Sequence, residues 1–467
     1  MNKLKLTFLA LILVLITTSG FGCTPDAAQQ QAQMTPLTLN VWGTWDDSDS
    51  FSDIIANYQA LHPFITINYR KLRPEEYEQA LLNALAEGNG PDIFTVQNTW
   101  VKKYLSKITP LPDQIDMIYP QEQGVVQKTT VAVHKATISL RPVDVKNNFV
   151  PAVYNDVVFP YQDPKSGAMA DKVFALPLAV DTMAMYYNID LLNNANISQL
   201  PTLWNTDFNQ DVAKLTKQDS AHKLVQSGVA LGGSANIDNS GDILSLLMMQ
   251  SGTQMMNGDT VTMAQVPSFF AGSGRNPTAE AVSFYTSFAD PSKLVYCWNN
   301  TLNNSTAQFT ADKLAILFAY SSALPLIRNQ NPKLNFGVQA MPQIQDSQDN
   351  INFANYWAYT VSNRSAHAGE AWDFIQFMTS ADQAKLYLAR AKKPTALRAL
   401  VDSQANDPDL GVFAKELLTA QSWYHGGDPL TAQKYMNDLI DQANASPDQL
   451  SQIIDLAANR IQQTINP

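Results

Sequence analysis

The chain has 467 residues, of which 45% are hydrophobic and 16% charged, and this composition is typical of a globular protein rather than a disordered polymer. Its length suits two packed lobes of roughly 200 residues each. The formal net charge of −11 argues against nucleic acid and anionic lipid as main partners, because both are themselves negatively charged.

The N-terminus has the parts of a secretory signal. Lys3 and Lys5 precede an apolar run over residues 6–16, and small residues then lead to Cys23. The run is too short to span a bilayer as a helix, which needs about 20 apolar residues. We therefore expect residues 1–22 to be a signal peptide and the protein to be exported.

Cys23 stands where a bacterial lipoprotein signal places its acylated cysteine. Gly20 and Phe21 depart from the usual lipobox, so a free exported protein with an incidental Cys23 stays open. The only other cysteine is Cys297, and acylation of Cys23 leaves no disulfide. We expect residues 23–36 to be a lipid-anchored flexible linker that keeps the protein on the outer face of the cytoplasmic membrane, or in the periplasm.

The folded body begins with strands and helices that alternate at short spacing. Apolar residues alternate with polar ones over residues 37–41 and 65–69, and a mostly apolar run follows over 93–96, which predicts three strands. Apolar residues recur at helical spacing over 51–61 and 74–85, between those strands. A β-α-β-α-β order predicts an α/β fold with a parallel, right-handed sheet.

The same kind of pattern resumes after a less regular stretch over residues 110–172. Helices are expected over 204–217, 241–249 and 276–288, and most of the chain after residue 362 has helical patterns. Extended segments are expected over 175–180, 183–187, 314–318, 336–338 and 353–361. No repeat of fixed period is visible, which argues against a solenoid.

Several runs resemble one family in family order. They are LTLNVWGTWDDSDSFSDIIANYQALHP, EGNGPDIF, ALPLAVDTMAMYYNIDLL, QFTADKLAILFAYSSALPLI, FGVQAMPQI and YWAYTVSNRSAHAGEAWDFIQFMTSADQAKLY. Together these runs are similar to the extracellular solute-binding proteins of carbohydrate ABC transporters (family 1), the group that includes maltose-binding protein. The resemblance extends from Leu37 to about Asp402, and residues 110–172 match least well.

The resemblance implies a two-lobed periplasmic-binding-protein fold with a ligand cleft between the lobes. Each lobe is expected to hold a central, mostly parallel sheet flanked by helices. The chain is expected to pass between the lobes near Val180, Pro342 and Pro394. The implied N-lobe comprises residues 37–180 and 343–391, and the implied C-lobe comprises residues 181–342 and 392–467.

The resemblance also implies which residues face the ligand. Indoles stack on the C–H faces of sugars, and carboxylates and amides bond to sugar hydroxyls. The positions that match, or lie at strand ends, are Trp45, Asp46, Asp47, Gln97, Asn98, Trp100, Asp181, Tyr320, Ser321, Trp357, Trp423 and Tyr424.

Each of these side chains also has a structural interpretation. The acids after the first strand suit a helix start, and an aromatic side chain is more often packed in a core than bound to a ligand. Asp181 follows an apolar run over residues 176–180, so its carboxylate must be paired with another group or face the ligand. Asp181 is the residue for which we expect ligand contact most strongly.

Enzyme motifs are missing from the sequence. GxSxG, HExxH, Walker A and GxGxxG do not occur, and the chain has five histidines. We therefore expect no catalysis, no cofactor and no metal, although a pair of glycosidase carboxylates cannot be recognised from spacing alone.

The resemblance implies a monomeric receptor that binds a small carbohydrate and meets the membrane subunits of an ABC permease. Two other functions stay open: an exported carbohydrate-binding sensor or adhesion protein, and a carbohydrate-active enzyme. Polyamines also stay open as ligands, because acids beside aromatic rings suit a cation almost as well as a sugar.

Overall fold

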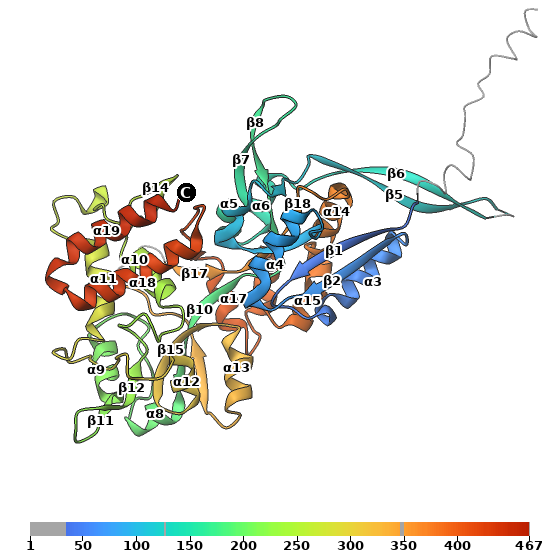
Figure 1. Ribbon diagram of the computed structural model, residues 1–467. Coiled ribbons are helices and arrows are strands. Elements are labelled where there is room, and N and C mark those ends of the chain that lie inside the picture. Colours follow the sequence, from blue (N-terminus) through green and yellow to red (C-terminus); the bar gives the residue numbers. More distant parts are fainter. Residues whose placement is uncertain (1–33, 126–127, 346–349, 467) are drawn as a thin grey trace, which may run out of the picture.

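The computed structural model describes residues 34–125, 128–345 and 350–466 of the chain (Figure 1). The expected signal peptide, Cys23 and most of the expected linker lie outside the described residues. The described chain forms two lobes, each built around one sheet. None of the helices in this described part is long and apolar enough to cross a membrane.

The first lobe is built on the strands expected from the sequence. Its sheet has the order β2 (Ile65–Lys71), β1 (Leu37–Gly43), β3 (Ile93–Gln97), β18 (Trp357–Ser362) and β4 (Ile108–Thr109), with β9 (Leu176–Pro177) paired to β18. Around it lie η1 (Ser48–Phe51), α3 (Ser52–Leu61), α4 (Pro74–Glu87), η2 (Asn98–Trp100), α5 (Val101–Tyr104), α14 (Ala368–Met378), α15 (Ala381–Ala391) and α16 (Arg398–Gln404).

The second lobe has a sheet of the order β11 (Lys217–Gln218), β12 (Leu224–Val229), β15 (Leu314–Tyr320), β10 (Asp181–Asn188), β17 (Asn352–Asn355) and β19 (Ala420–Gln421), with β16 (Phe336–Gln339) paired to β10. Its other elements are α8 (Ile189–Asn194), α9 (Thr206–Leu215), α10 (Ser240–Gln250), β13 (Met256–Asn257), β14 (Thr260–Val261), η3 (Ser268–Phe270), α11 (Pro277–Ser287), α12 (Ser305–Thr310), α13 (Ala323–Gln330), α18 (Pro429–Ala445), η4 (Pro447–Gln449) and α19 (Leu450–Gln463).

The expected two-lobed α/β fold is confirmed, but both sheets are mixed rather than mostly parallel. β1 is parallel to β2 and β3, but β18 runs antiparallel to β3, β4 and β9. In the second sheet β10 is antiparallel to β15, β16 and β17. The reason is that β10 and β18 continue from strands of the other lobe, so each enters its sheet from the side of the cleft.

The buried side chains divide the chain between two cores. One core takes residues from 39–180 and 354–420, and the other takes residues from 183–353 and 413–465. Phe353 lies in the second core and Leu400 in the first, so the later passages between lobes lie further along the chain than Pro342 and Pro394. β17 pairs with β10, which keeps residues up to 355 on the second sheet.

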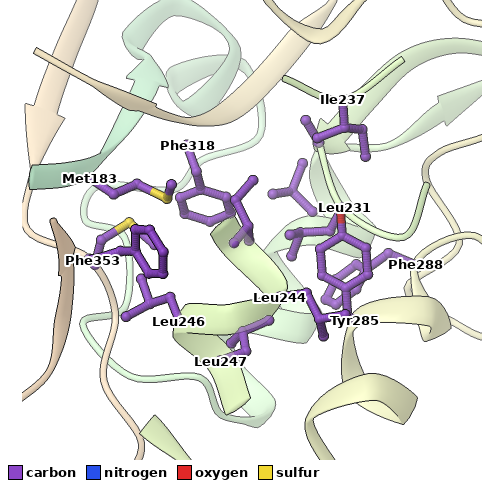
Figure 2. Close-up of a cluster of buried hydrophobic side chains, with 14 of the residues drawn as sticks. Met183, Leu231, Ile237, Leu244, Leu246, Leu247, Tyr285, Phe288, Phe318 and Phe353 are labelled. Carbon is purple, nitrogen blue, oxygen red and sulfur yellow. The ribbon is translucent and has the colours of Figure 1, made fainter. Parts of the chain in front are cut away.

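The core of the second lobe forms around one nearly all-apolar helix. α10 buries Leu244, Leu246 and Leu247 completely or almost so. Figure 2 shows these side chains between Phe318 and Phe353 on one side and Tyr285 on the other. A helix enclosed on all sides has a fixed position, and its first turn faces the other lobe.

Residues 110–172, for which no regular structure was expected, hold two hairpins and two short helices. The hairpins are β5 (Gln114–Gln123) with β6 (Thr129–Ile138), and β7 (Val158–Gln162) with β8 (Met169–Val173). The helices are α6 (Pro142–Asn148) and α7 (Pro151–Val157). The β5–β6 hairpin extends away from the first lobe (Figure 1), and mainly its base is buried, through Ile115 and Met117. Strands with so few buried residues give little apolar alternation to detect.

Candidate ligand-binding cleft between the lobes

A cavity of about 220 Å³ lies between the two lobes. From the first lobe it is lined by the end of β3 and by η2, and from the second by the first turn of α10 and the loop before α18. β17, the strand before the second passage between lobes, forms the third side. Of the expected ligand-facing residues, the cavity is lined by Gln97, Asn98, Trp100, Trp423 and Tyr424.

A chain of aromatic rings leads from the surface to this cavity. Trp45 is 54% exposed, and its ring centroid lies 6.4 Å from that of Trp357. The ring of Trp357 lies 5.5 Å from that of Trp100, which lines the cavity, and 5.7 Å from that of Tyr77. These contacts are edge-to-face, an arrangement that stabilises aromatic pairs and fixes ring orientation. The aromatic group is therefore preformed on the first lobe.

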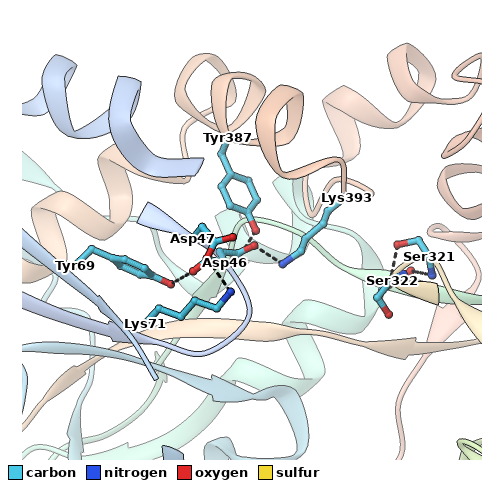
Figure 3. Close-up of polar contacts among 9 residues, drawn as sticks. Asp46, Asp47, Tyr69, Lys71, Ser321, Ser322, Tyr387 and Lys393 are labelled. Atoms are coloured by element: carbon cyan, nitrogen blue, oxygen red, sulfur yellow. Dashed lines mark hydrogen bonds and ion pairs between the residues drawn. The ribbon is translucent and has the colours of Figure 1, made fainter. Parts of the chain in front are cut away.

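Asp46 and Asp47 do not line the cavity. The carboxylate of Asp46 accepts hydrogen bonds from Tyr387 at 3.0 Å and from Lys393 at 2.5 Å (Figure 3). Asp47 forms an exposed ion pair with Lys71 at 2.9 Å. Both acids therefore bind cations of their own lobe, and Asp46 ties the turn after β1 to the segment that follows α15.

Asp181 lies at the start of β10, at the boundary between the lobes, and not on the cavity wall. Its carboxylate accepts hydrogen bonds from the amide and hydroxyl of Ser321 at 3.0 and 2.7 Å, and from the amide of Thr182 at 2.9 Å. None of its hydrogen-bond donors within the described chain is a cation. Burial raises the pKa of Asp181 to about 6, and the hydrogen bonds oppose this shift only in part.

Asp242 and Asn355 are among the cavity residues that the sequence reasoning missed. Asp242 lies in the first turn of α10 and accepts a hydrogen bond from the Tyr320 hydroxyl at 2.7 Å. Burial raises its pKa to about 6. Asn355 accepts a hydrogen bond from Gln97 at 3.1 Å. The sequence held a usable indication for Asp242, because it is the only charged residue of a largely apolar helix.

A buried carboxylate beneath the cavity was also missed. Asp156 on α7 is 1% exposed, and accepts hydrogen bonds from Asn98 at 3.0 Å and Tyr356 at 2.8 Å. It also bonds to the hydroxyl of Ser422, and the ring nitrogen Nε2 of His425 lies 2.9 Å away. Asn98 is thus held by a structural partner, and the same network brings the loop that carries Trp423 and Tyr424 against the first lobe.

Trp423 and Tyr424 are fixed from the second lobe as well. The indole of Trp423 donates to the hydroxyl of Ser245 on α10 at 3.1 Å. The hydroxyl of Tyr424 bonds to Thr464 at the end of α19. Both rings are more than nine-tenths buried, so each presents a fixed surface to the cavity.

The lining of the cavity has no cationic side chain among the described residues. Its polar groups are amides, hydroxyls and the carboxylate of Asp242. Such groups donate to and accept from hydroxyls, but they give a phosphate or carboxylate no charged partner. In the described part of the chain there is also no group of three His, Cys, Asp or Glu side chains that could hold a metal ion.

The two lobes touch directly beside the cleft. Lys102 on α5 forms an ion pair at 2.7 Å with Asp259, in the turn between β13 and β14. The backbone carbonyl of Asp259 accepts a hydrogen bond from Gln462 on α19, which fixes the turn on its own lobe. This conformation therefore holds the lobes together on one side of the cleft.

Comparison with known proteins agrees with this architecture. Residues 42–385 match the bacterial extracellular solute-binding protein family. The chain belongs to this family. Members are exported solute receptors and not enzymes, so this solute-binding protein is an exported, non-enzymatic receptor.

Individual relatives are distant. A putative binding protein of Brucella suis biovar 1 is 22% identical over 379 residues, 79% of either chain. The multiple sugar-binding protein of Streptococcus mutans is 23% identical over 238 residues, 51% of this chain and 54% of its own. The crystal structure of the cyclic α-maltosyl-1,6-maltose binding protein of Arthrobacter globiformis has a TM-score of 0.69 at 14% identity, covering 92% of this chain and 99% of its own.

The half-buried acid Asp242 predicts a pH dependence of stability. Its pKa in the folded protein is about 6, above the ordinary 3.8. Between these values the folded state keeps a proton that the unfolded state has lost. The free energy of unfolding therefore falls as pH rises from about 4 to 6, by up to about 1.4 kcal/mol per pH unit for this group.

Asp242→Asn should remove this contribution and keep an oxygen that accepts from Tyr320. We expect the variant to gain stability relative to the wild type as pH rises from 4 to 7, measured as melting temperature or urea midpoint at each pH. Asp455→Asn, at an exposed position on α19, is the control and should follow the wild type. Parallel curves for wild type and Asp242→Asn would contradict the prediction.

Proposed function

We propose that this solute-binding protein is the extracytoplasmic receptor of an ABC importer and captures a small neutral carbohydrate between its lobes. One observation carries the proposal: the interlobe cavity combines amide and hydroxyl groups with rigid indoles and has no cation among its described lining residues. A sugar presents hydroxyls around its rim and C–H groups on its faces, and this lining matches both.

The size of the cavity limits the ligand in this conformation. A volume of about 220 Å³ is below the roughly 300–1,000 Å³ of typical small-molecule pockets. A short saccharide suits the cavity better than a long chain. The exposed ring of Trp45 and its neighbour Trp357 extend the stacking surface beyond the cavity, toward further sugar units.

The relatives support a carbohydrate as the class of ligand. The Streptococcus mutans relative is named for binding multiple sugars, and the Arthrobacter globiformis protein for binding a cyclic maltosyl-maltose. The permease partner follows from the transport role of the family. A sensor or adhesion receptor would use the same cleft, and only the presence of a cognate permease separates these functions.

One observation favours a second class of ligand. Asp242 on the cavity wall and Asp181 at the lobe boundary have no cationic hydrogen-bond partner among the described residues. A polyamine beside the indoles would supply that missing positive charge. Because two half-buried carboxylates favour a cation and the amide-rich lining favours hydroxyls, a ligand screen must contain both classes.

Stacking on Trp357 and Trp45 leads to a prediction for binding. In a thermal-shift screen of the exported protein against sugars, polyamines and amino acids, we expect a neutral saccharide to raise the melting temperature. Calorimetry with that saccharide should show that Trp357→Ala and Trp45→Ala each cost about 1–3 kcal/mol of binding free energy.

Trp42→Ala is the matched control. Trp42 lies on β1, where Arg70 covers its ring at 4.9 Å, and no ring contact joins it to the Trp45–Trp357 pair within the described chain. We expect the affinity of Trp42→Ala for the saccharide to equal that of the wild type. Stabilisation by polyamines alone would exclude a carbohydrate ligand, and unchanged affinity in both test variants would exclude stacking by these indoles.

Transport requires that the permease distinguish the loaded from the empty receptor, which hinge closure provides. We predict a smaller radius of gyration in small-angle scattering when the saccharide is bound. Lys102→Glu places a negative charge opposite Asp259 and should lower affinity up to about fivefold, because it disfavours only the closed state. Identical scattering curves with and without saturating ligand would exclude closure.

Lys214→Glu is the control for this charge reversal. Lys214 forms an ion pair with Asp211 on the same helix, α9, within the second lobe. Reversing its charge changes the net charge by the same amount without touching the contact between lobes. The affinity of Lys214→Glu for the saccharide should match that of the wild type. An equal loss of affinity in Lys102→Glu and Lys214→Glu would show that net charge, and not the contact between lobes, causes the loss.

We also predict that an acyl chain on Cys23 anchors the receptor to the membrane. Acylation would hold the receptor at the membrane that contains its permease. Cys23→Ser should release the protein into the soluble exported fraction, and metabolic labelling with a palmitate analogue should mark the wild type only. Unlabelled wild-type protein would exclude the lipid anchor.

A further inference from the structure

A second, larger hollow lies on the first lobe, away from the interlobe cleft. It has a volume of about 1190 Å³ and lies among the β5–β6 hairpin, α6, and the ends of α3 and α14. It shares no lining residue with the cavity between the lobes. The established solute-binding role of the family does not require a site here.

The hollow contains cations without acidic partners. Arg398, at the start of α16, and Lys135, on β6, line it, and neither forms an ion pair with any residue of the described chain. Lys135 lies over the ring of Tyr119, with its ammonium 5.6 Å from the centroid. In a protein of net charge −11, two exposed cations that line one hollow and have no acidic partner favour an anion there.

The acids of the hollow are already engaged. Asp144 pairs with Arg141 on the rim at 2.9 Å. Asp373 accepts a hydrogen bond from Tyr58 at 2.9 Å and lies 3.7 Å from His62. The charges of Lys135 and Arg398 are therefore not neutralised by neighbouring carboxylates.

A buried hydroxyl without a partner lies in the same wall. Ser139 is 5% exposed, and its Oγ has no hydrogen-bond partner within the described chain. A buried hydroxyl that makes no hydrogen bond lowers stability, so a ligand that accepts a hydrogen bond from it recovers this cost. The lining thus contains a donor that the protein itself leaves unused.

The first turn of α15 adds donors at the edge of the hollow. Ser380 and Ala381 line it, and Ser380 precedes this helix of 11 residues without capping it. The hydroxyl of Ser380 instead donates to the carbonyl of Phe377. The uncapped amides at a helix N-terminus carry partial positive charge and favour an anion.

The remaining wall is apolar. Phe149 and Leu397 are buried, Leu140 and Phe377 are half-buried, and all four line the hollow. Ile138, on the same hairpin, is 79% exposed at its edge. An inorganic ion would leave this apolar surface in contact with water.

We propose that this hollow is a second ligand site, for an amphipathic anion in which one carboxylate or phosphate group is joined to an apolar body. Lys135 and Arg398 supply the positive charge that attracts the anionic group, the Ser139 hydroxyl offers a hydrogen-bond donor in the wall, and the apolar body covers Leu140, Phe149 and Phe377. The site is independent of the solute cleft and of the ligand that the cleft binds.

Three probes separate the parts of this recognition. Octanoate has both an anionic group and an apolar body, octanamide has the body without the charge, and acetate has the charge without the body. In calorimetry with the exported protein we expect octanoate to bind and the other two to bind at least about tenfold more weakly. Octanamide loses the charged hydrogen bonds, and acetate loses the contact with the apolar wall.

The variant Lys135→Gln/Arg398→Gln should lower octanoate affinity by about tenfold or more. Lys333→Gln, exposed on the second lobe, is the control and should leave it unchanged. Affinity for the saccharide of the cleft should be the same in both variants and the wild type. Octanoate binding that survives the double substitution, or equal binding of octanamide, would overturn the proposal.

Ser139→Ala gives a readout that a purely structural residue would not give. Removing an unpaired buried hydroxyl should leave the melting temperature of the empty protein unchanged or higher, while octanoate binds severalfold more weakly. A lower melting temperature with unchanged octanoate affinity would assign Ser139 to the fold alone and contradict its role in the site.

The anion can come from a free metabolite or from a membrane lipid, and sedimentation with vesicles separates the two. Vesicles of phosphatidylcholine are compared with vesicles containing phosphatidylglycerol. Sedimentation that requires phosphatidylglycerol and is lost in Lys135→Gln/Arg398→Gln identifies a lipid headgroup. Octanoate binding without such sedimentation identifies a free ligand, and absence of both binding and sedimentation overturns the site.

Discussion

The carboxylate of Asp156 connects the parts of the chain that form the cleft. It is buried on α7, and it bonds to Asn98 after β3, to Tyr356 between β17 and β18, and to the loop after β19. A buried charge is tolerated only when several donors surround it, so these three segments must meet at one point. The position of Trp423 against the first lobe, and hence the shape of the cavity, depends on that requirement.

The distribution of charge separates structural from binding roles. Asp46 and Asp47, beside the exposed Trp45, are neutralised by Lys393 and Lys71 of their own lobe. Asp181 and Asp242 are instead held by hydroxyl and amide donors, and their raised pKa values reflect burial without a compensating cation. The first pair stabilises a turn, whereas the second pair leaves the interlobe region able to accept either hydroxyls or a positive charge.

The sequence was sufficient for the local elements of both lobes but not for their pairing. Alternation and helical spacing located β1, α3, β2, α4 and β3, since each buries one regular face. The antiparallel strands depend on passages between lobes, which leave no local pattern. The same holds for the cleft: Trp100 and Trp423 were found because they follow recognisable elements, but Asp156 and Asn355 gain their roles only from partners distant in sequence.

Closure of the lobes must be driven mainly by the ligand. The direct link beside the cleft, Lys102 with Asp259, is a partly exposed ion pair, and such pairs contribute about 0–1 kcal/mol. Shifting a two-state equilibrium from 1:99 to 99:1 requires about 5.5 kcal/mol of differential binding. Most of that difference has to come from contacts that a ligand makes with both lobes at once, to Trp100 and Gln97 on one side and to Asp242 and Trp423 on the other. In the proposed mechanism, the residues that recognise the solute are therefore also those that signal its presence.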